Sequence, residues 1–314
     1  MQCYARAMLV SAASVAFVLA LGHPSAGEPL DFTTPAQPPQ PILGGEPTGP
    51  GEFDGVVAIV AGHGLCTGTV VAPRLILTAG HCLRNVPPSS GVHVYFGDQL
   101  SPTMTTPAVD WGIHPDFCSD CREDIFDYGF VTIATDFTVP GGYTLPIVSQ
   151  EEWDAAMVAG GEVTLVGYGD DPSTPDSIGI KRKVTTNIRR FSPKGLEFFA
   201  GGDDRDSCQG DSGGPAFVRL DDGTMRLAGI TSRGSSPCGA GGYYGAPYPA
   251  LCWVREQTGV DMLQTECDRC DCLRTVAPES GCSIASTDGG RTRAGAWLAL
   301  LLVTLRRRRA PASR

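Results

Sequence analysis

The stretch DSCQGDSGGP, residues 206–215, decides the fold that we expect for this chain. It places Ser212 in a tight turn between glycines, which let the backbone bend sharply and leave N–H groups exposed. The N–H groups of Gly210 and Ser212 can then converge on one oxygen atom. A nucleophile beside donors of this kind is what acyl transfer to a serine requires.

Two further motifs supply the partners of such a nucleophile. LTAGHC at 77–82 places His81 at the end of an apolar stretch, and DYGFVTI at 127–133 places Asp127 at the start of another. Nucleophilic catalysis by serine needs a base that takes its proton and a group that orients the base. Three separate motifs in the order His, Asp, Ser therefore predict a catalytic triad.

The sequence around these motifs is typical of an all-β protein. Helical patterns are scarce, and the best one lies at 248–263. The 40 Gly and 25 Pro among 314 residues indicate many turns. Many short strands without helices between them favour an antiparallel sandwich or barrel. The apolar runs that we predict as strands include 56–61, 68–80, 91–97, 128–133, 162–169, 215–220 and 225–232.

Composition excludes several classes of function. The formal net charge is −10 at pH 7, and the basic cluster that a nucleic-acid groove needs occurs only at Arg306–Arg309. The zinc-protease motif HExxH is absent from the sequence, and no set of cysteines has zinc-finger spacing. We expect no metal, no cofactor and no nucleic-acid partner.

The N-terminal segment predicts export. Arg6, an apolar run at 7–21 and small residues at 25–27 have the order of a secretory signal, which we place at 1–26. Residues 27–41 are Pro-rich and predict a propeptide or linker. Secretion suits the 12 cysteines of the chain, because disulfides form in oxidising compartments.

These motifs together resemble the trypsin/chymotrypsin family over about residues 42–263. The resemblance implies an all-β fold of two antiparallel six-stranded β-barrels packed together, with a C-terminal α-helix and the site in the cleft between the barrels. It implies a protease domain at 42–266 and a serine endopeptidase acting on protein or peptide substrates, which we expect to be a monomer. The segments that carry the resemblance are ILGGEP at 42–47, CTGTVVAPRLILTAGHC at 66–82, GYG at 167–169, DSCQGDSGGP at 206–215 and GITSRG at 229–234.

The resemblance assigns a role to each member of the triad. Ser212 is the nucleophile, His81 is the general base and then the acid, and Asp127 holds the imidazole tautomer. Gly210 and Ser212 form the oxyanion hole. Asp124 is a rival for Asp127, because DIF also resembles the motif, but it would leave a charged Asp127 on a buried strand.

Specificity also follows from the resemblance. Asp206 matches the base of the primary pocket, where a carboxylate selects Arg or Lys before the cleaved bond. Ser232, Gly234 and Gly242 match substrate-binding positions, and the two glycines keep the pocket walls open. Arg233 stands where the family usually has Trp, which favours acidic residues further upstream in the substrate.

Activation departs from the family pattern. In the family, cleavage before Ile42 frees an ammonium that pairs with Asp211, and this pairing matters because a lone buried carboxylate costs about 3–5 kcal/mol. The residue before Ile42 is Pro41 rather than Arg or Lys. We therefore expect a different protease to process the propeptide.

The resemblance also pairs cysteines. It implies Cys66–Cys82 beside the His motif and Cys208–Cys238 beside the pocket, and Cys118–Cys121 can close a short loop. The family's common pair just upstream of the nucleophile turn is absent. Four more cysteines have a pairing that the sequence leaves open, namely Cys252, Cys267, Cys270 and Cys272.

Residues 267–314 read as a Cys-rich tail with an apolar segment at 294–305 and an Arg cluster at 306–309. This order resembles the C-terminal sorting tags of myxobacterial surface proteins. The tag interpretation predicts cleavage near Cys282, transient membrane anchoring, and display on the cell surface or outer membrane. The alternative is a permanent weak anchor whose Arg cluster stays in the cytoplasm.

A second class of function stays open at this stage, a catalytically silent binding protein on the same scaffold. Relatives of that kind usually lose the His or the Ser motif. Both motifs are intact here, which favours the enzyme.

Overall fold

The computed structural model describes residues 41–87, 90–170, 178–235, 238–263, 267 and 269–275. They belong to the second of two compact units of the chain, Pro39–Arg314. The predicted signal, the propeptide apart from Pro41, and the tail beyond Thr275 lie outside the described residues.

Six antiparallel strands close into the first β-barrel, in the order β2-β3-β4-β7-β6-β5. The apolar run of β4 is buried along its whole length, whereas β5 alternates buried and half-buried residues. Such alternation turns every second side chain toward the barrel interior. The strands are β2 (Val56–Ala61), β3 (Gly64–Ala72), β4 (Leu75–Thr78), β5 (Val92–Tyr95), β6 (Thr105–Ile113) and β7 (Gly129–Ile133).

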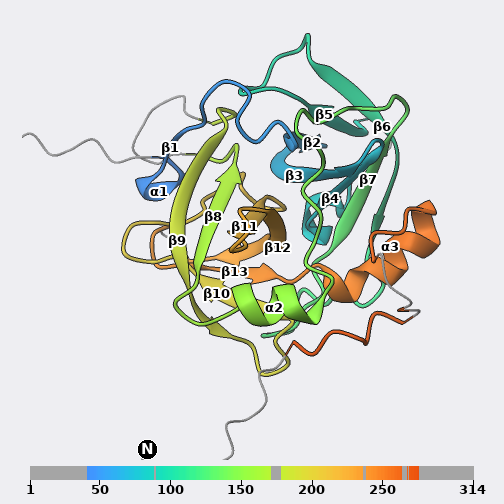
Figure 1. Ribbon diagram of the computed structural model, residues 1–314. Helices are drawn as coiled ribbons and strands as arrows, with labels where there is room; N and C mark the ends of the chain where they lie inside the picture. Colours follow the sequence, from blue (N-terminus) through green and yellow to red (C-terminus); the bar gives the residue numbers. More distant parts are fainter. Residues whose placement is uncertain are drawn as a thin grey trace, which may run out of the picture. The chain divides into compact units, whose positions relative to one another are not determined.

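Six more antiparallel strands form the second barrel, in the order β9-β10-β13-β12-β11-β8, which closes because β8 also pairs with β9. The short strand β1 (Glu46–Pro47) adds to β9 outside the ring. The prediction of two six-stranded antiparallel barrels is confirmed (Figure 1). The strands are β8 (Glu162–Gly167), β9 (Arg182–Phe191), β10 (Glu197–Ala200), β11 (Pro215–Arg219), β12 (Met225–Gly234) and β13 (Gly242–Gly245).

The closing helix predicted at 248–263 is also present. It begins with a 3-10 turn, η2 (Tyr248–Ala250), and continues as α3 (Leu251–Thr258), which ends at the left-handed residue Gly259. Although α3 follows the last strand of the second barrel, it packs on the first. Trp253 of α3 and Phe130 of β7 have ring centroids 5.2 Å apart, and Figure 1 shows α3 beside β7.

The strands β1, β6, β9, β10 and β13 were not predicted, and the single run predicted at 68–80 is divided between β3 and β4. Two short helical elements were not predicted either. The helix α2 (Gln150–Ala156) is capped by Ser149, whose hydroxyl accepts from the Glu152 backbone N–H at 3.2 Å. The turn α1 (Pro41–Gly44) contains Ile42 with a positive φ of 32°, so it is not a regular helix. A third short element, the 3-10 turn η1 (Gly80–Leu83), carries the His motif.

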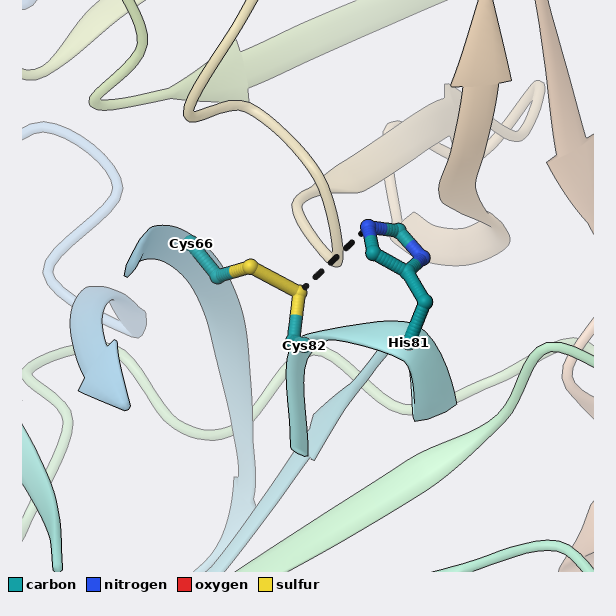
Figure 2. Close-up of side chains that lie close together, drawn as sticks. All are labelled: Cys66, His81 and Cys82. Carbon is teal, nitrogen blue, oxygen red and sulfur yellow. Dashed lines mark hydrogen bonds between the residues drawn. A yellow bond between two sulfur atoms is a disulfide. The ribbon is translucent and has the colours of Figure 1, made fainter. Parts of the chain in front are cut away.

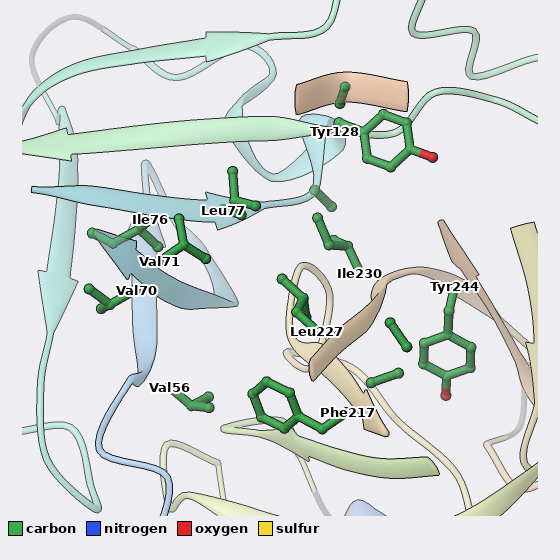
Figure 3. Packing of buried hydrophobic residues seen from close by; sticks show 14 of the residues in the cluster. Val56, Val70, Val71, Ile76, Leu77, Tyr128, Phe217, Leu227, Ile230 and Tyr244 are labelled. Atoms are coloured by element: carbon green, nitrogen blue, oxygen red, sulfur yellow. The ribbon is translucent and has the colours of Figure 1, made fainter. Parts of the chain in front are cut away.

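One hydrophobic core joins the two barrels (Figure 3). The core includes Leu77 from β4 of the first barrel, and Leu227 and Ile230 from β12 of the second. All three side chains are at most 3% exposed. Burying a side chain of this size contributes about 1.5–3 kcal/mol. The core therefore fixes the two barrels against each other, and with them the loops that meet at their junction.

The chain after α3 folds back onto the second barrel as far as Thr275. The disulfide Cys252–Cys270 joins this segment to α3, and Cys267–Cys272 closes a loop within it. The Tyr248 hydroxyl accepts from the Leu273 backbone N–H at 3.1 Å, and the Thr275 hydroxyl donates to the Lys194 carbonyl at 2.6 Å. The first residues of the predicted tail, up to Thr275, are therefore packed against the protein. Among the described helices, none is long and apolar enough to cross a membrane.

Candidate active site

His81 stands in η1, directly after β4, with its ring one-third exposed. The disulfide Cys66–Cys82 ties this turn to β3. In Figure 2 the Cys82 Sγ lies 3.8 Å from His81 Nε2. This is a packing contact, because a disulfide sulfur carries no proton to donate. The ring nitrogen Nε2 therefore stays available on the open side of the imidazole.

Asp127 holds the other side of the ring. Its Oδ2 accepts from His81 Nδ1 at 2.7 Å, and its Oδ1 accepts from the His81 backbone N–H at 2.8 Å. The Ser232 hydroxyl donates to the same Oδ2 at 2.7 Å. The carboxylate is only 4% exposed, so these bonds replace its lost hydration. The three donors fix the proton on Nδ1 and leave Nε2 as the acceptor.

Asp124, the rival carboxylate, faces elsewhere. Its Oδ1 accepts from the Ser192 hydroxyl at 2.5 Å, and its backbone N–H donates to Glu197. The residue that lies against His81 is Asp127.

Ser212 and His81 line the same pocket, which has a volume of about 440 Å³. The turn is fastened by its backbone, because the Thr67 N–H donates to the Ser212 carbonyl at 2.8 Å. No hydrogen bond joins His81 and Ser212 among the residues that the structure describes. Catalytic hydrogen bonds are often long before substrate arrives.

The nucleophile turn offers two unused donors. Gly210 has a φ of 99°, which only glycine adopts readily. Within the described parts of the chain, the N–H groups of Gly210 and Ser212 donate to no protein acceptor, whereas that of Asp211 donates to the Cys208 carbonyl at 3.1 Å. Two free N–H groups beside a serine hydroxyl suit an oxyanion.

Ser212 also lines a second pocket, which has a volume of about 180 Å³. Gly234 lines it, and Gly242 is the residue paired with Gly234 in the β12–β13 register. The disulfide Cys208–Cys238 joins two lining residues. A third disulfide, Cys118–Cys121, lies in the loop before β7.

Asp206 directly precedes Ser207, a lining residue of this second pocket, and is itself fully buried. Its carboxylate accepts from the backbone N–H groups of Ser207 at 2.8 Å, Gly241 at 2.8 Å and Gly239 at 3.2 Å. Burial raises the pKa of the carboxyl, and these three N–H groups oppose the rise. No cation among the described residues forms an ion pair with it.

Asp211 is the second buried carboxyl of the turn. Its oxygens accept from the backbone N–H groups of Gly169 and Cys208, both at 2.8 Å. Gly169 is required by this approach, since a Cβ there would lie 2.6 Å from the carboxyl carbon. Burial raises the pKa of Asp211 to about 7. Ile42, which the resemblance links to Asp211, is 1% exposed.

The environment of Arg233 does not support the expectation that this residue favours acidic residues in the substrate. Its guanidinium forms a two-bond ion pair with Glu197, with N–O distances of 2.8 and 2.9 Å. The charge of Arg233 is therefore already balanced inside the protein, which removes the reason to expect acidic residues upstream in a substrate. Sequence reasoning missed Glu197, because nothing in the sequence links β10 to β12. It also assigned Ser232 only to substrate binding, although its hydroxyl bonds Asp127.

Two side-chain groups among the described residues come close to a metal-binding arrangement, Cys66–His81–Cys82 and Cys267–Asp271–Cys272. In both groups the sulfur atoms are joined to other sulfurs as disulfides. A disulfide sulfur is not the thiolate that a metal needs. These groups therefore do not fit a metal ion.

Two antiparallel barrels with a serine, a histidine and an aspartate at their junction define the serine protease class of fold. The chain belongs to the trypsin family, because the family model "Trypsin" matches residues 42–250. The match spans the elements from Ile42 to the start of the closing helix.

Individual relatives agree with the family. The chain is 26% identical to Melanization protease 1 of Drosophila melanogaster over 65% of this chain and 61% of that protein. It is 27% identical to Trypsin 5G1 of Aedes aegypti over 62% and 76%, and 30% identical to Serine protease 56 of Homo sapiens over 69% and 38%. The alignments cover less than two thirds of the length of Melanization protease 1 and of Serine protease 56.

Proposed function

We propose that the protein is a serine endopeptidase that cleaves protein or peptide substrates after Arg or Lys. The observation that carries the proposal is the contact of His81 Nδ1 with Asp127 at 2.7 Å. It aims Nε2 into the pocket that Ser212 also lines. No cofactor is needed for this chemistry.

The reaction follows from these positions. The Ser212 hydroxyl attacks the scissile carbonyl carbon while Nε2 of His81 takes its proton. The N–H groups of Gly210 and Ser212 stabilise the negative charge that forms on the carbonyl oxygen. Protonated His81 then gives its proton to the leaving amine, which departs as the acyl-enzyme forms. Water, deprotonated by His81, attacks the ester and releases the acid and Ser212.

Asp206 supports the choice of Arg or Lys. It is a buried carboxylate with no counter-ion of its own among the described residues, and the next residue in the chain, Ser207, lines the pocket beside Ser212. A cationic substrate side chain would supply that counter-ion, and charge-assisted hydrogen bonds are the strong ones. Gly234 and Gly242 leave the walls free of side chains.

A substrate panel tests this specificity. Peptides with Arg, Lys, Phe or Ala before the cleaved bond are compared by kcat/KM, with the Asp206→Asn variant alongside. We expect cleavage after Arg and Lys, and a loss of about 10²–10³-fold for Asp206→Asn, because the bound cation is then buried unpaired. Cleavage only after Phe in the unsubstituted protein would contradict the role of Asp206.

Processing before Ile42 is part of the proposal. The buried Asp211 has only neutral N–H partners in the described chain, and a freed Ile42 ammonium would supply the missing charge. Since Pro41 precedes the bond, a protease of different specificity makes the cut. N-terminal sequencing of active protein would contradict this if it began upstream of Ile42.

We propose that the protein is exported from the cell, as the sequence predicts. Residues 1–26 direct secretion, and the segment after the packed residues anchors the protein transiently or displays it on the surface. The protease domain acts as a monomer.

A further inference from the structure

Glu197 on β10 is a buried carboxylate with four donors. Its side chain is 3% exposed. Arg233 donates from Nη1 to Oε1 at 2.8 Å and from Nη2 to Oε2 at 2.9 Å. The backbone N–H groups of Asp124 and Ile125 donate to Oε2 at 2.9 Å and to Oε1 at 3.2 Å. Each oxygen thus holds one donor from the guanidinium and one from the backbone.

The donors come from two segments that meet at Asp127. Asp124 and Ile125 belong to the loop that leads directly into Asp127. Arg233 follows Ser232 on β12, and the Ser232 hydroxyl donates to Asp127 at 2.7 Å. Arg233 also donates to the Arg122 carbonyl at 2.9 Å, which fastens the same loop a second time.

The pair is held firmly. A two-bond guanidinium–carboxylate contact restricts both distance and angle. The guanidinium lies 4.3 Å from the centre of the Tyr243 ring on β13. Burial lowers the pKa of Arg233, but the Glu197 carboxylate outweighs burial and the pKa is raised overall. The Arg233 guanidinium therefore keeps its charge in the folded protein.

We propose that Glu197 and Arg233 are positioning residues for catalysis, which hold the loop before Asp127 and strand β12 in the register that aims Asp127 at His81. The inference rests on the proposed function. Neither side chain touches the reacting atoms. The rival explanation is that Arg233, which lines the pocket beside Ser212, binds upstream substrate residues directly.

The sharpest variant replaces both partners, Glu197→Leu with Arg233→Leu. The net charge of the protein is unchanged, although the variant also removes the electrostatic attraction between Arg233 and Asp127. Replacing a buried ion pair by apolar groups of similar size often leaves the fold stable, while the loop loses its two carboxylate acceptors. The matched control is Glu152→Leu with Arg226→Leu, a partly buried pair at 2.8 Å that joins α2 to the far end of β12.

The test measures two rates on processed protein. One is labelling of Ser212 by a small fluorophosphonate, and the other is hydrolysis of a blocked single-residue arginine amide, too short to extend along β12. We expect the double variant to lose about 10–100-fold in labelling rate and in kcat, because small misplacements in an active site cost about that much. KM should stay within about twofold, and the control pair should change neither rate.

The pH profile separates positioning from general loosening. A poorly aimed Asp127 stabilises the imidazolium less, so the acid limb of kcat/KM should move to lower pH in the double variant. Labelling at the unsubstituted rate overturns the inference, as does a raised KM confined to peptides with three residues upstream of the cleaved bond. Absence of labelling in the unsubstituted protein instead contradicts the proposed function, and the inference falls with it.

Discussion

Replacing Asp127 with Asn is expected to lower kcat by about 10⁴-fold with little change in KM. The carboxylate now accepts from His81 Nδ1, from the His81 backbone N–H and from the Ser232 hydroxyl. An amide has only one acceptor oxygen, so its NH₂ group must face either the Nδ1 side or the backbone N–H of His81. If it faces Nδ1, the imidazole must carry its proton on Nε2, where it can no longer accept the proton of Ser212.

The measurement is kcat and KM on an arginine amide, with Asp124→Asn as the matched control. Asp124 lies three residues away, and its carboxylate contacts the Ser192 hydroxyl rather than His81. The control should retain activity within a few-fold. Equal losses in the two variants would show that Asp127 has no special role.

In the unprocessed chain, Asp211 alone is expected to contribute a loss of about 4 kcal/mol of folding stability between pH 4 and pH 8. Burial raises the pKa of Asp211 from 3.8 to about 7, and each unit corresponds to about 1.36 kcal/mol. A raised carboxyl pKa favours the folded state while the group is protonated. The contribution is therefore complete below pH 3.8 and is lost as pH rises through about 7.

Processing should remove this loss. A freed Ile42 ammonium beside Asp211 favours the charged carboxylate and brings its pKa back down. Urea unfolding of the Ser212→Ala variant, cleaved and uncleaved, at pH 4 and pH 8 measures the difference without self-digestion. Asp206, whose pKa is also raised, is present in both forms, and the Asp211→Asn variant measures its share.

Two results would bear on this prediction. The variant Asp211→Asn should show the same pH dependence whether or not it is cleaved. If cleaved and uncleaved Ser212→Ala forms respond identically to pH, Ile42 does not pair with Asp211.

Much of the fold could be predicted because its signals are local. Apolar runs in the sequence predict most of the strands, and the pattern at 248–263 predicts the closing helix. The helix α2 was missed, although Ser149 followed by Glu152 is a capping pattern, because seven residues are too few for a helical period to emerge.

The site residues that stand in sequence motifs could be predicted. Those that are brought together only by long-range contacts could not. His81, Asp127 and Ser212 stand in separate sequence motifs, and the glycine at position 210 itself predicts a tight turn. The Glu197–Arg233 pair joins residues 36 apart on strands that are not neighbours in sequence. The pairing of Cys252, Cys267, Cys270 and Cys272 was likewise open, since three connectivities are equally consistent with their spacing.

The central claim is that Ser212 is an activated nucleophile, and covalent labelling tests it most directly. Protein beginning at Ile42 is treated with a fluorophosphonate and digested, and the modified peptide is identified by mass spectrometry. The account predicts one label, on Ser212, which is abolished in Ser212→Ala and strongly slowed in His81→Ala. Correctly processed and folded protein that takes no label would contradict it and favour a silent binding protein on the same scaffold.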